Sequence, residues 1–154
     1  MKWLTVDIGQ EHIVQFEMFP ISHEEKPFDN AAEASSLEEI AGQQEKVFQD
    51  ILFSMIDERK LKDSEVYQRA WIDRKYFSKI RTKRGYVPKR NTVIALGLAL
   101  RLDEKEFDYL FASAGYSLVP ASRFDRLVRY CFQHKIYRMR RVNEILSEYT
   151  GMTL

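Results

Sequence analysis

The sequence predicts a mainly α-helical fold, with a multi-helix domain preceded by a short N-terminal β-hairpin. From about residue 44 onward, apolar side chains recur at the three- and four-residue spacing of a helix with one buried face. Before that point, two short segments alternate apolar and polar side chains, as half-buried strands do. A chain of 154 residues with 45% hydrophobic content suits one compact core and is short for two.

The first 43 residues are expected to form two parts. Residues 1–19 alternate twice around Gly-Gln-Glu-His, which predicts a hairpin arm with two apolar faces: Leu4, Val6 and Ile8, then Val14, Phe16 and Met18. Two strands alone are marginal in water, so the arm must dock on the helices, pair with a second copy or belong to a larger sheet. Residues 20–43 shift to Glu, Ala, Ser and Pro, which indicates an acidic linker with one short helix around Leu37 to Ala41.

The helical domain is expected over residues 44–154, and its first helix ends near Lys60. Asp63 and Asp73 are predicted to cap the second and third helices. The inward apolar positions of these three helices are Phe48, Ile51, Leu52, Met55, Ile56, Val66, Tyr67, Ala70, Phe77 and Ile80.

Four more helices follow in the prediction. The fourth, from Thr92 to about Arg101, is apolar nearly all round and should be the central buried helix, with another backbone passing close to Gly97. Asp103 caps the fifth, which Gly115 ends, and Ser122 with Asp125 caps the sixth. The inward positions are Phe107, Leu110, Phe111, Phe124, Leu127, Val128 and Cys131, then Val142, Ile145, Leu146 and Tyr149 in a last helix from about Met139 to Thr150.

The net charge of +1 conceals two halves of opposite sign. Residues 1–45 hold two basic and ten acidic side chains, a net of −8, whereas the remainder holds 22 basic and 13 acidic ones, a net of +9. An acidic arm on a basic domain can be a solvated linker, an intramolecular cover for the basic surface or part of an interface with another protein.

The third predicted helix and the loop after it form the strongest functional signal. Eight basic residues and no acid lie between positions 74 and 90, a density that predicts polyanion binding. In a major groove, residues near the helix start would reach base edges and later ones would contact phosphates. The candidate nucleic-acid-binding residues are Arg74, Lys75, Ser78, Lys79, Arg81, Lys83, Arg84, Lys89 and Arg90. Tyr76 and Tyr86 could stack on bases of a single strand or RNA. The alternative is a charged exterior that supports solubility or binds the acidic arm.

A secondary basic patch opens the last helix, at Arg138, Arg140 and Arg141. Positive charge at a helix N-terminus costs about 0.3 to 1 kcal/mol per exposed group, so local stability does not explain three arginines. They suggest an anionic partner, unless the helix starts later, near Val142.

The pattern argues against other classes of function. The chain has no nucleotide-binding glycine loop, no nucleophile elbow and no paired His and Cys ligands, and helix capping accounts for its main acidic positions. Cys131 is the only cysteine and the three histidines are scattered. The longest apolar run, Val93 to Leu100, is too short to span a bilayer, and the N-terminus lacks the order of a signal peptide. We therefore expect a cytoplasmic, non-enzymatic protein with no metal, no cofactor and no membrane partner.

Residues 61–83 resemble the helix-turn-helix of the lambda repressor and Cro family. The apolar places of that motif are taken by Leu61, Val66, Ala70, Ile72, Phe77 and Ile80, with Asp73 in place of the serine cap. Pro88 followed by Val93, Leu96, Ala99 and Leu100 resembles the next helix of the family, so the resemblance covers residues 48–112. It implies a helix-turn-helix-like core and DNA binding. Trp71 replaces the usual glycine of the turn, which predicts positive φ at a bulky residue, and Tyr67 replaces the usual alanine, which predicts a differently packed helix pair.

A longer stretch, residues 45–150, resembles a helical module at the C-terminal end of some bacterial proteins that carry a macro domain or another catalytic domain. The resemblance rests on the run from Asp63 to Tyr116 and on SRFDRLVRYCFQH after it. It implies that the acidic segment is a linker. The function expected overall is regulatory nucleic-acid binding in a bacterial or phage setting, with DNA favoured over RNA. The alternative is a protein-interaction or autoregulatory module of a defence or signalling system, and a homodimer is open in either case.

Overall fold

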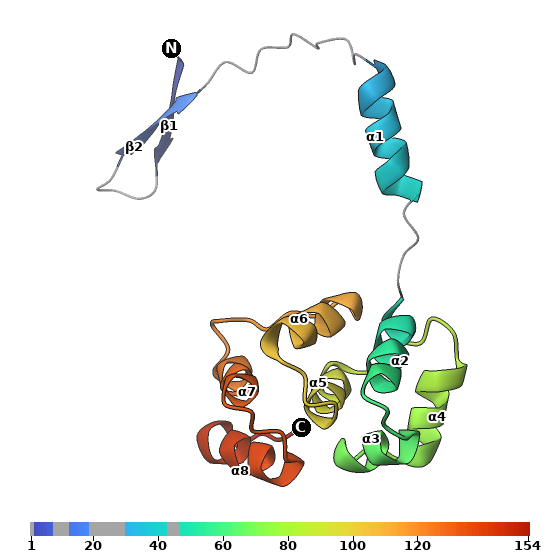
Figure 1. Ribbon diagram of the computed structural model, residues 1–154. Coiled ribbons are helices and arrows are strands. Elements are labelled where there is room, and N and C mark those ends of the chain that lie inside the picture. Colours follow the sequence, from blue (N-terminus) through green and yellow to red (C-terminus); the bar gives the residue numbers. More distant parts are fainter. Residues whose placement is uncertain (1, 8–12, 19–29, 43–46) are drawn as a thin grey trace. The chain divides into compact units, whose positions relative to one another are not determined.

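The computed structural model describes residues 2–7, 13–18, 30–42 and 47–154, which divide into two units, Met1–Gln44 and Glu45–Leu154 (Figure 1). Eight helices occur in these described stretches, so the fold is mainly α, as predicted. No helix there is long and apolar enough to cross a membrane.

The first unit contains two strands and one helix. Strands β1 (Lys2–Asp7) and β2 (Ile13–Met18) pair antiparallel, and residues 8–12 between them lie outside the described residues. The hairpin arm over residues 1–19 stays a prediction. Helix α1 (Asn30–Gly42) is longer than the short helix predicted around Leu37 to Ala41, because its run of Ala and Glu favours helix before any apolar periodicity begins. Its described side chains are all exposed.

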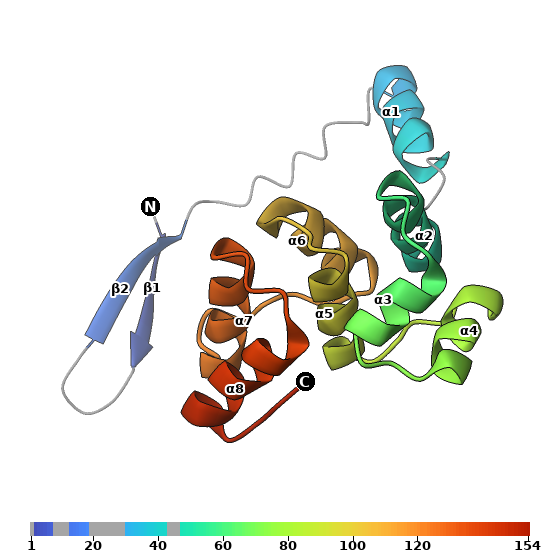
Figure 2. The same ribbon diagram turned by 60° about the horizontal axis from the view of Figure 1, so that its bottom comes forward.

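The second unit holds the seven helices that the pattern predicts for it. They are α2 (Phe48–Glu58), α3 (Asp63–Arg69), α4 (Arg74–Thr82), α5 (Arg90–Ala99), α6 (Glu104–Ser113), α7 (Arg123–Gln133) and α8 (Met139–Thr150). Helix α5 packs against α3, α6 and α8 (Figures 1 and 2). Its residues from Val93 to Ala99 are all buried. The prediction of a central buried helix is confirmed.

Gly97 marks the tightest contact of α5. A Cβ atom built there would lie 2.6 Å from Cδ2 of Phe107 and 3.2 Å from Cζ of Phe132. The expectation of a close backbone was wrong: two aromatic rings from α6 and α7 make the close approach. These rings stack with centroids 4.1 Å apart, which leaves no room for a side chain at residue 97.

The predicted helix starts are partly correct. Asp103 accepts a hydrogen bond from Glu106 N at 2.8 Å, and Ser122 Oγ accepts one from Asp125 N at 3.2 Å, as expected for caps. Asp63 is not a cap, because α3 begins with it and Lys62 precedes it as the N-cap residue. Asp73 is the N-cap residue of α4, although its side chain makes no capping hydrogen bond.

Most of the predicted inward positions are buried. Tyr67 and Leu127 are only half-buried, while Phe132, which was not predicted, joins the core. Tyr149 is wrong as a core residue, because it is 57% exposed on the last turn of α8. Cys131 is fully buried, and burial raises the pKa of its thiol to about 11, so it behaves as a core residue.

Helices α3 and α4 are joined by a turn of four residues, 70–73. Trp71 has φ of 56°, which confirms positive φ at a bulky residue. Tyr67 packs its ring against Phe77 with centroids 5.7 Å apart, and Phe53 meets the same ring edge-on at 6.1 Å. Tyr67 of α3 and Phe77 of α4 therefore meet through their aromatic rings, with Phe53 of α2 against the same Phe77 ring.

Candidate functional site

Helix α4 has one buried and one cationic face. Phe77 and Ile80 are 2% and 0% exposed, so they set the rotation of the helix on the core. The opposite face leaves polar and basic side chains exposed, namely Arg74, Lys75, Ser78 and Lys79. No carboxylate of the described residues forms an ion pair with these three basic groups. Their charge is therefore available to an anionic partner.

The end of α4 is tied to α2 by one buried amide. Gln49 Nε2 donates to the carbonyl of Ile80 at 2.8 Å and to that of Lys83, while Gln49 Oε1 accepts from Gly85 N at 2.9 Å. These bonds satisfy the carbonyl groups at the helix end and hold the loop after it. Lys83 and Arg84 are consequently exposed on an anchored segment.

Two tyrosines border the cationic face. Tyr76 and Tyr86 meet edge-on with centroids 6.1 Å apart, and the Nζ of Lys79 lies 4.6 Å from the centre of the Tyr86 ring. A lysine over an aromatic face is stabilised by the ring quadrupole. Both rings are half-buried, so the stacking on bases that the sequence suggested would need this aromatic pair to open.

Arg81 and Arg90 have partners inside the protein. Arg81 pairs with Asp63 at 2.5 Å and places its guanidinium 4.1 Å from the centre of the Phe53 ring, which links α4 to α3 and α2. The Arg90 guanidinium forms a bidentate ion pair with the Asp125 carboxylate, at 2.9 and 2.6 Å, and also donates to Ser117 O at 2.9 Å. Both arginines therefore serve the fold, whereas Lys89 is exposed with the rest of the predicted set.

The secondary basic patch of Arg138, Arg140 and Arg141 forms a second cationic surface at the start of α8. Helix α8 begins at Met139, so the alternative of a later start near Val142 was wrong, and Arg140 and Arg141 lie in its first turn. Both arginines reach one carboxylate, Glu144, at 3.5 and 3.4 Å. Arg138 precedes them as the exposed N-cap residue.

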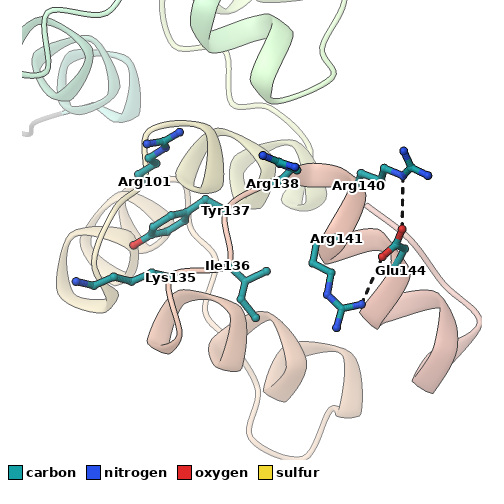
Figure 3. Close-up of a pocket in the computed structure, with 8 residues that line it drawn as sticks. All are labelled: Arg101, Lys135, Ile136, Tyr137, Arg138, Arg140, Arg141 and Glu144. Carbon is teal, nitrogen blue, oxygen red and sulfur yellow. Dashed lines mark hydrogen bonds and ion pairs between the residues drawn. The ribbon is translucent and has the colours of Figure 1, made fainter.

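A pocket of about 700 Å³ lies beside this patch, and Figure 3 shows the side chains around it. Its lining comes from the ends of three helices: Arg101, Lys135, Ile136, Tyr137, Arg138, Arg140, Arg141 and Glu144. A smaller pocket of about 250 Å³ shares Arg101, Tyr137, Arg138 and Arg140 and adds Arg69, Trp71, Leu98, Ala99 and Met139. Because the two pockets share these four lining residues, we call them together the arginine groove.

The groove gathers residues that pattern analysis did not associate. Arg101 and Lys135 are each the second residue after a helix end, with φ of 53° and 54°, a position at which glycine is usual. Leu102 N and Ile136 N close these ends by bonding back to Gly97 O and Cys131 O, at 3.2 and 2.8 Å. The available signal was a basic residue directly before an apolar one at each helix end. Burial raises the pKa of Tyr137, whose hydroxyl donates to Leu102 O at 2.9 Å.

No protein-family model, curated protein or solved structure matches the chain. Within the part of the chain that the structure describes, no group of three or more His, Cys, Asp or Glu side chains is placed to hold a metal ion.

Proposed function

We propose that the helical unit binds nucleic acid, with duplex DNA favoured over RNA, through the exposed face of α4. One observation carries the proposal: Arg74, Lys75 and Lys79 are exposed on a helix that buries Phe77 and Ile80 on its other face. Solvated helices usually mix charges of both signs, whereas phosphate-binding surfaces concentrate one sign.

The position of α4 supports a helix-turn-helix role. It follows α3 after a short turn, as a recognition helix does. In a major groove, Arg74, Lys75, Ser78 and Lys79 would face base edges, and Lys83, Arg84 and Lys89 would contact phosphates. The proposed contacts do not include Arg81 and Arg90, because these arginines form ion pairs with Asp63 and Asp125.

Fluorescence anisotropy with labelled duplex DNA, single-stranded DNA and RNA over a salt series tests the proposal. For duplex DNA, log K should fall with log salt by about 0.9 per phosphate contact. Lys75→Glu/Lys79→Glu should abolish duplex binding at moderate salt. A matched control is Lys105→Glu/Arg123→Glu, which makes the same change in net charge at exposed positions in the first turns of α6 and α7, where acidic residues suit the helix dipole.

If both double variants lose affinity equally, binding follows net charge and α4 has no special role. If no nucleic acid binds even at low salt, the result favours the alternative function, a protein-interaction or autoregulatory module. A protein interface depends much less on salt than phosphate contacts do, so the same series separates the two classes.

Three further features belong to the proposal. The setting is regulation or defence in a bacterium or phage. The N-terminal hairpin provides an arm whose strand edges are open to pairing with another sheet or a second copy. Homodimerisation would place two α4 helices on two half-sites, and sedimentation velocity with and without duplex DNA measures it.

A further inference from the structure

Trp71 is the residue that the fold explains least. It is 63% exposed, so the core gains little from it, and its left-handed backbone is costly for a bulky side chain. Arg101 and Lys135 share this conformation, but their charges are favoured at a helix C-terminus. Trp71 has no such compensation. Strained residues of this kind concentrate at functional sites.

The surroundings of Trp71 are cationic. The arginine groove contains six basic side chains and one carboxylate, Glu144, which already contacts two of the arginines. In Figure 3, Arg101, Lys135 and Tyr137 lie on one side of the larger pocket, and Arg140, Arg141 and Glu144 lie on the other. A groove with cations on both sides suits a ligand that carries several negative charges along its length.

An exposed aromatic ring beside a row of cations is the arrangement with which proteins bind single-stranded nucleic acid. The cations follow the phosphates, and the ring stacks on a base. A duplex already stacks its bases on one another, so it offers no free base face to Trp71. The ring and the charges are therefore used together only if the ligand is unpaired.

We infer that the arginine groove is a second nucleic-acid site, which holds a single-stranded segment with a base stacked on Trp71 and phosphates at Arg69, Arg138, Arg140 and Lys135. The site goes beyond duplex binding by α4 and does not depend on it. Trp71 stands in the turn just before α4, so one nucleic acid with an unpaired end could reach both surfaces.

Tryptophan fluorescence of the 154-residue chain tests the stacking. Trp3→Phe leaves Trp71 as the only tryptophan. A thymidine octamer should quench its emission, whereas an octamer of abasic sites, with the same phosphates and no bases, should not. By anisotropy, Trp71→Ala should weaken binding of the thymidine octamer by about 5- to 150-fold, the range for one base–aromatic stack, and Trp71→Phe should keep most of it.

Three controls locate the binding. Tyr109→Ala removes another half-exposed aromatic ring, on α6, and should leave the affinity unchanged. Arg138→Gln/Arg140→Gln should lower the salt slope for the octamer by about 1.4, at about 0.7 per single-strand phosphate contact. Lys75→Glu/Lys79→Glu should spare octamer binding while it removes duplex binding, which separates the two sites. Circular dichroism confirms that each variant is folded.

Two results would overturn the inference. Equal binding of the thymidine and abasic octamers without quenching would show that the groove senses charge alone. Loss of octamer binding in the α4 variant, with normal binding in the Trp71 and arginine variants, would place the single strand on α4. Failure of duplex binding with intact octamer binding would refute the α4 proposal and leave the groove assignment standing.

Discussion

At the scale of single residues, several side chains that line the arginine groove belong to residues that follow a helix end and have left-handed backbone. Lys60, Trp71, Arg101 and Lys135 all have φ between 52° and 56°, where glycine is the usual residue. Three of the four line the groove, and Lys60 does not. This difference makes Lys60 an internal reference, because it has the strain of the others without their position.

Glycine at these sites should separate stability from binding. Lys60→Gly and Lys135→Gly should each raise the free energy of unfolding by about 0.5 to 1 kcal/mol. Relief of about 1 to 2 kcal/mol of left-handed strain exceeds the lost helix-dipole interaction and the added chain entropy. Only Lys135→Gly should also weaken binding of a single-stranded octamer, with a salt slope lower by about 0.7. Urea unfolding and anisotropy measure the two effects.

Equal loss of octamer affinity in both glycine variants would contradict the groove assignment, because Lys60 lies outside it. A fall in stability for both would instead show that the two lysines gain more from the helix C-termini than the backbone strain costs.

At the scale of elements, α5 is the helix on which α3, α6 and α8 pack, and Gly97 lets neighbouring aromatic rings lie close to its backbone. Gly97 admits the ring of Phe107, which stacks between Phe111 at 4.9 Å and Phe132 at 4.1 Å. The Arg90 and Asp125 pair joins the start of the same helix to α7. The other end of α5 leads into Arg101, which lines the arginine groove.

Gly97→Ala should lower the stability of the unit. Alanine gains about 1 kcal/mol of helix propensity, but a methyl group 2.6 Å from a fully buried ring costs about 1 to 3 kcal/mol of overpacking. We expect a net loss of up to about 2 kcal/mol in urea unfolding. Phe107→Leu should cost less stability in the Gly97→Ala chain than in the wild type, because it removes the colliding ring atoms.

A double-mutant cycle measures this difference as the coupling energy between Gly97→Ala and Phe107→Leu. Additive effects of the two substitutions would show that the ring moves aside and that α5 is less tightly held than its contacts indicate.

At the scale of the whole molecule, charge and core divide the chain at nearly the same place. Every buried apolar residue of the described core lies between Phe48 and Leu146. Residues 1–44 hold two basic and nine acidic side chains, whereas both cationic surfaces belong to Glu45–Leu154. The basic unit thus has a core of its own.

Deletion of residues 1–44 should leave the urea midpoint and Tm of the helical unit unchanged, because the deletion removes no residue of its core. A clear fall in Tm would show that the first unit contributes to the folded state.

The same truncated chain distinguishes the roles of the acidic arm. A large rise in duplex affinity at physiological salt would identify it as a cover for the basic surface, and unchanged affinity would identify it as a linker.

Local sequence patterns suffice to predict the seven helices of the basic unit and most of the residues that they bury. Helical periodicity, the caps at Asp103 and Ser122, and the helix end at Gly115 are local, so neighbouring residues suffice to predict them. The same local rules predicted the exposed cations of α4, because Phe77 and Ile80 set which face is buried.

Tertiary structure decided which cations are available and which come together. Arg81 and Arg90 resemble their neighbours in the sequence, yet Asp63 and Asp125, 18 and 35 residues away, occupy them. Trp71, Arg101 and Lys135 come from three separate turns, and only the packing of α3, α7 and α8 with α5 and α6 joins them into one groove. Pairing partners and pocket walls depend on distances between segments that are remote in the chain, and no local pattern contains those distances.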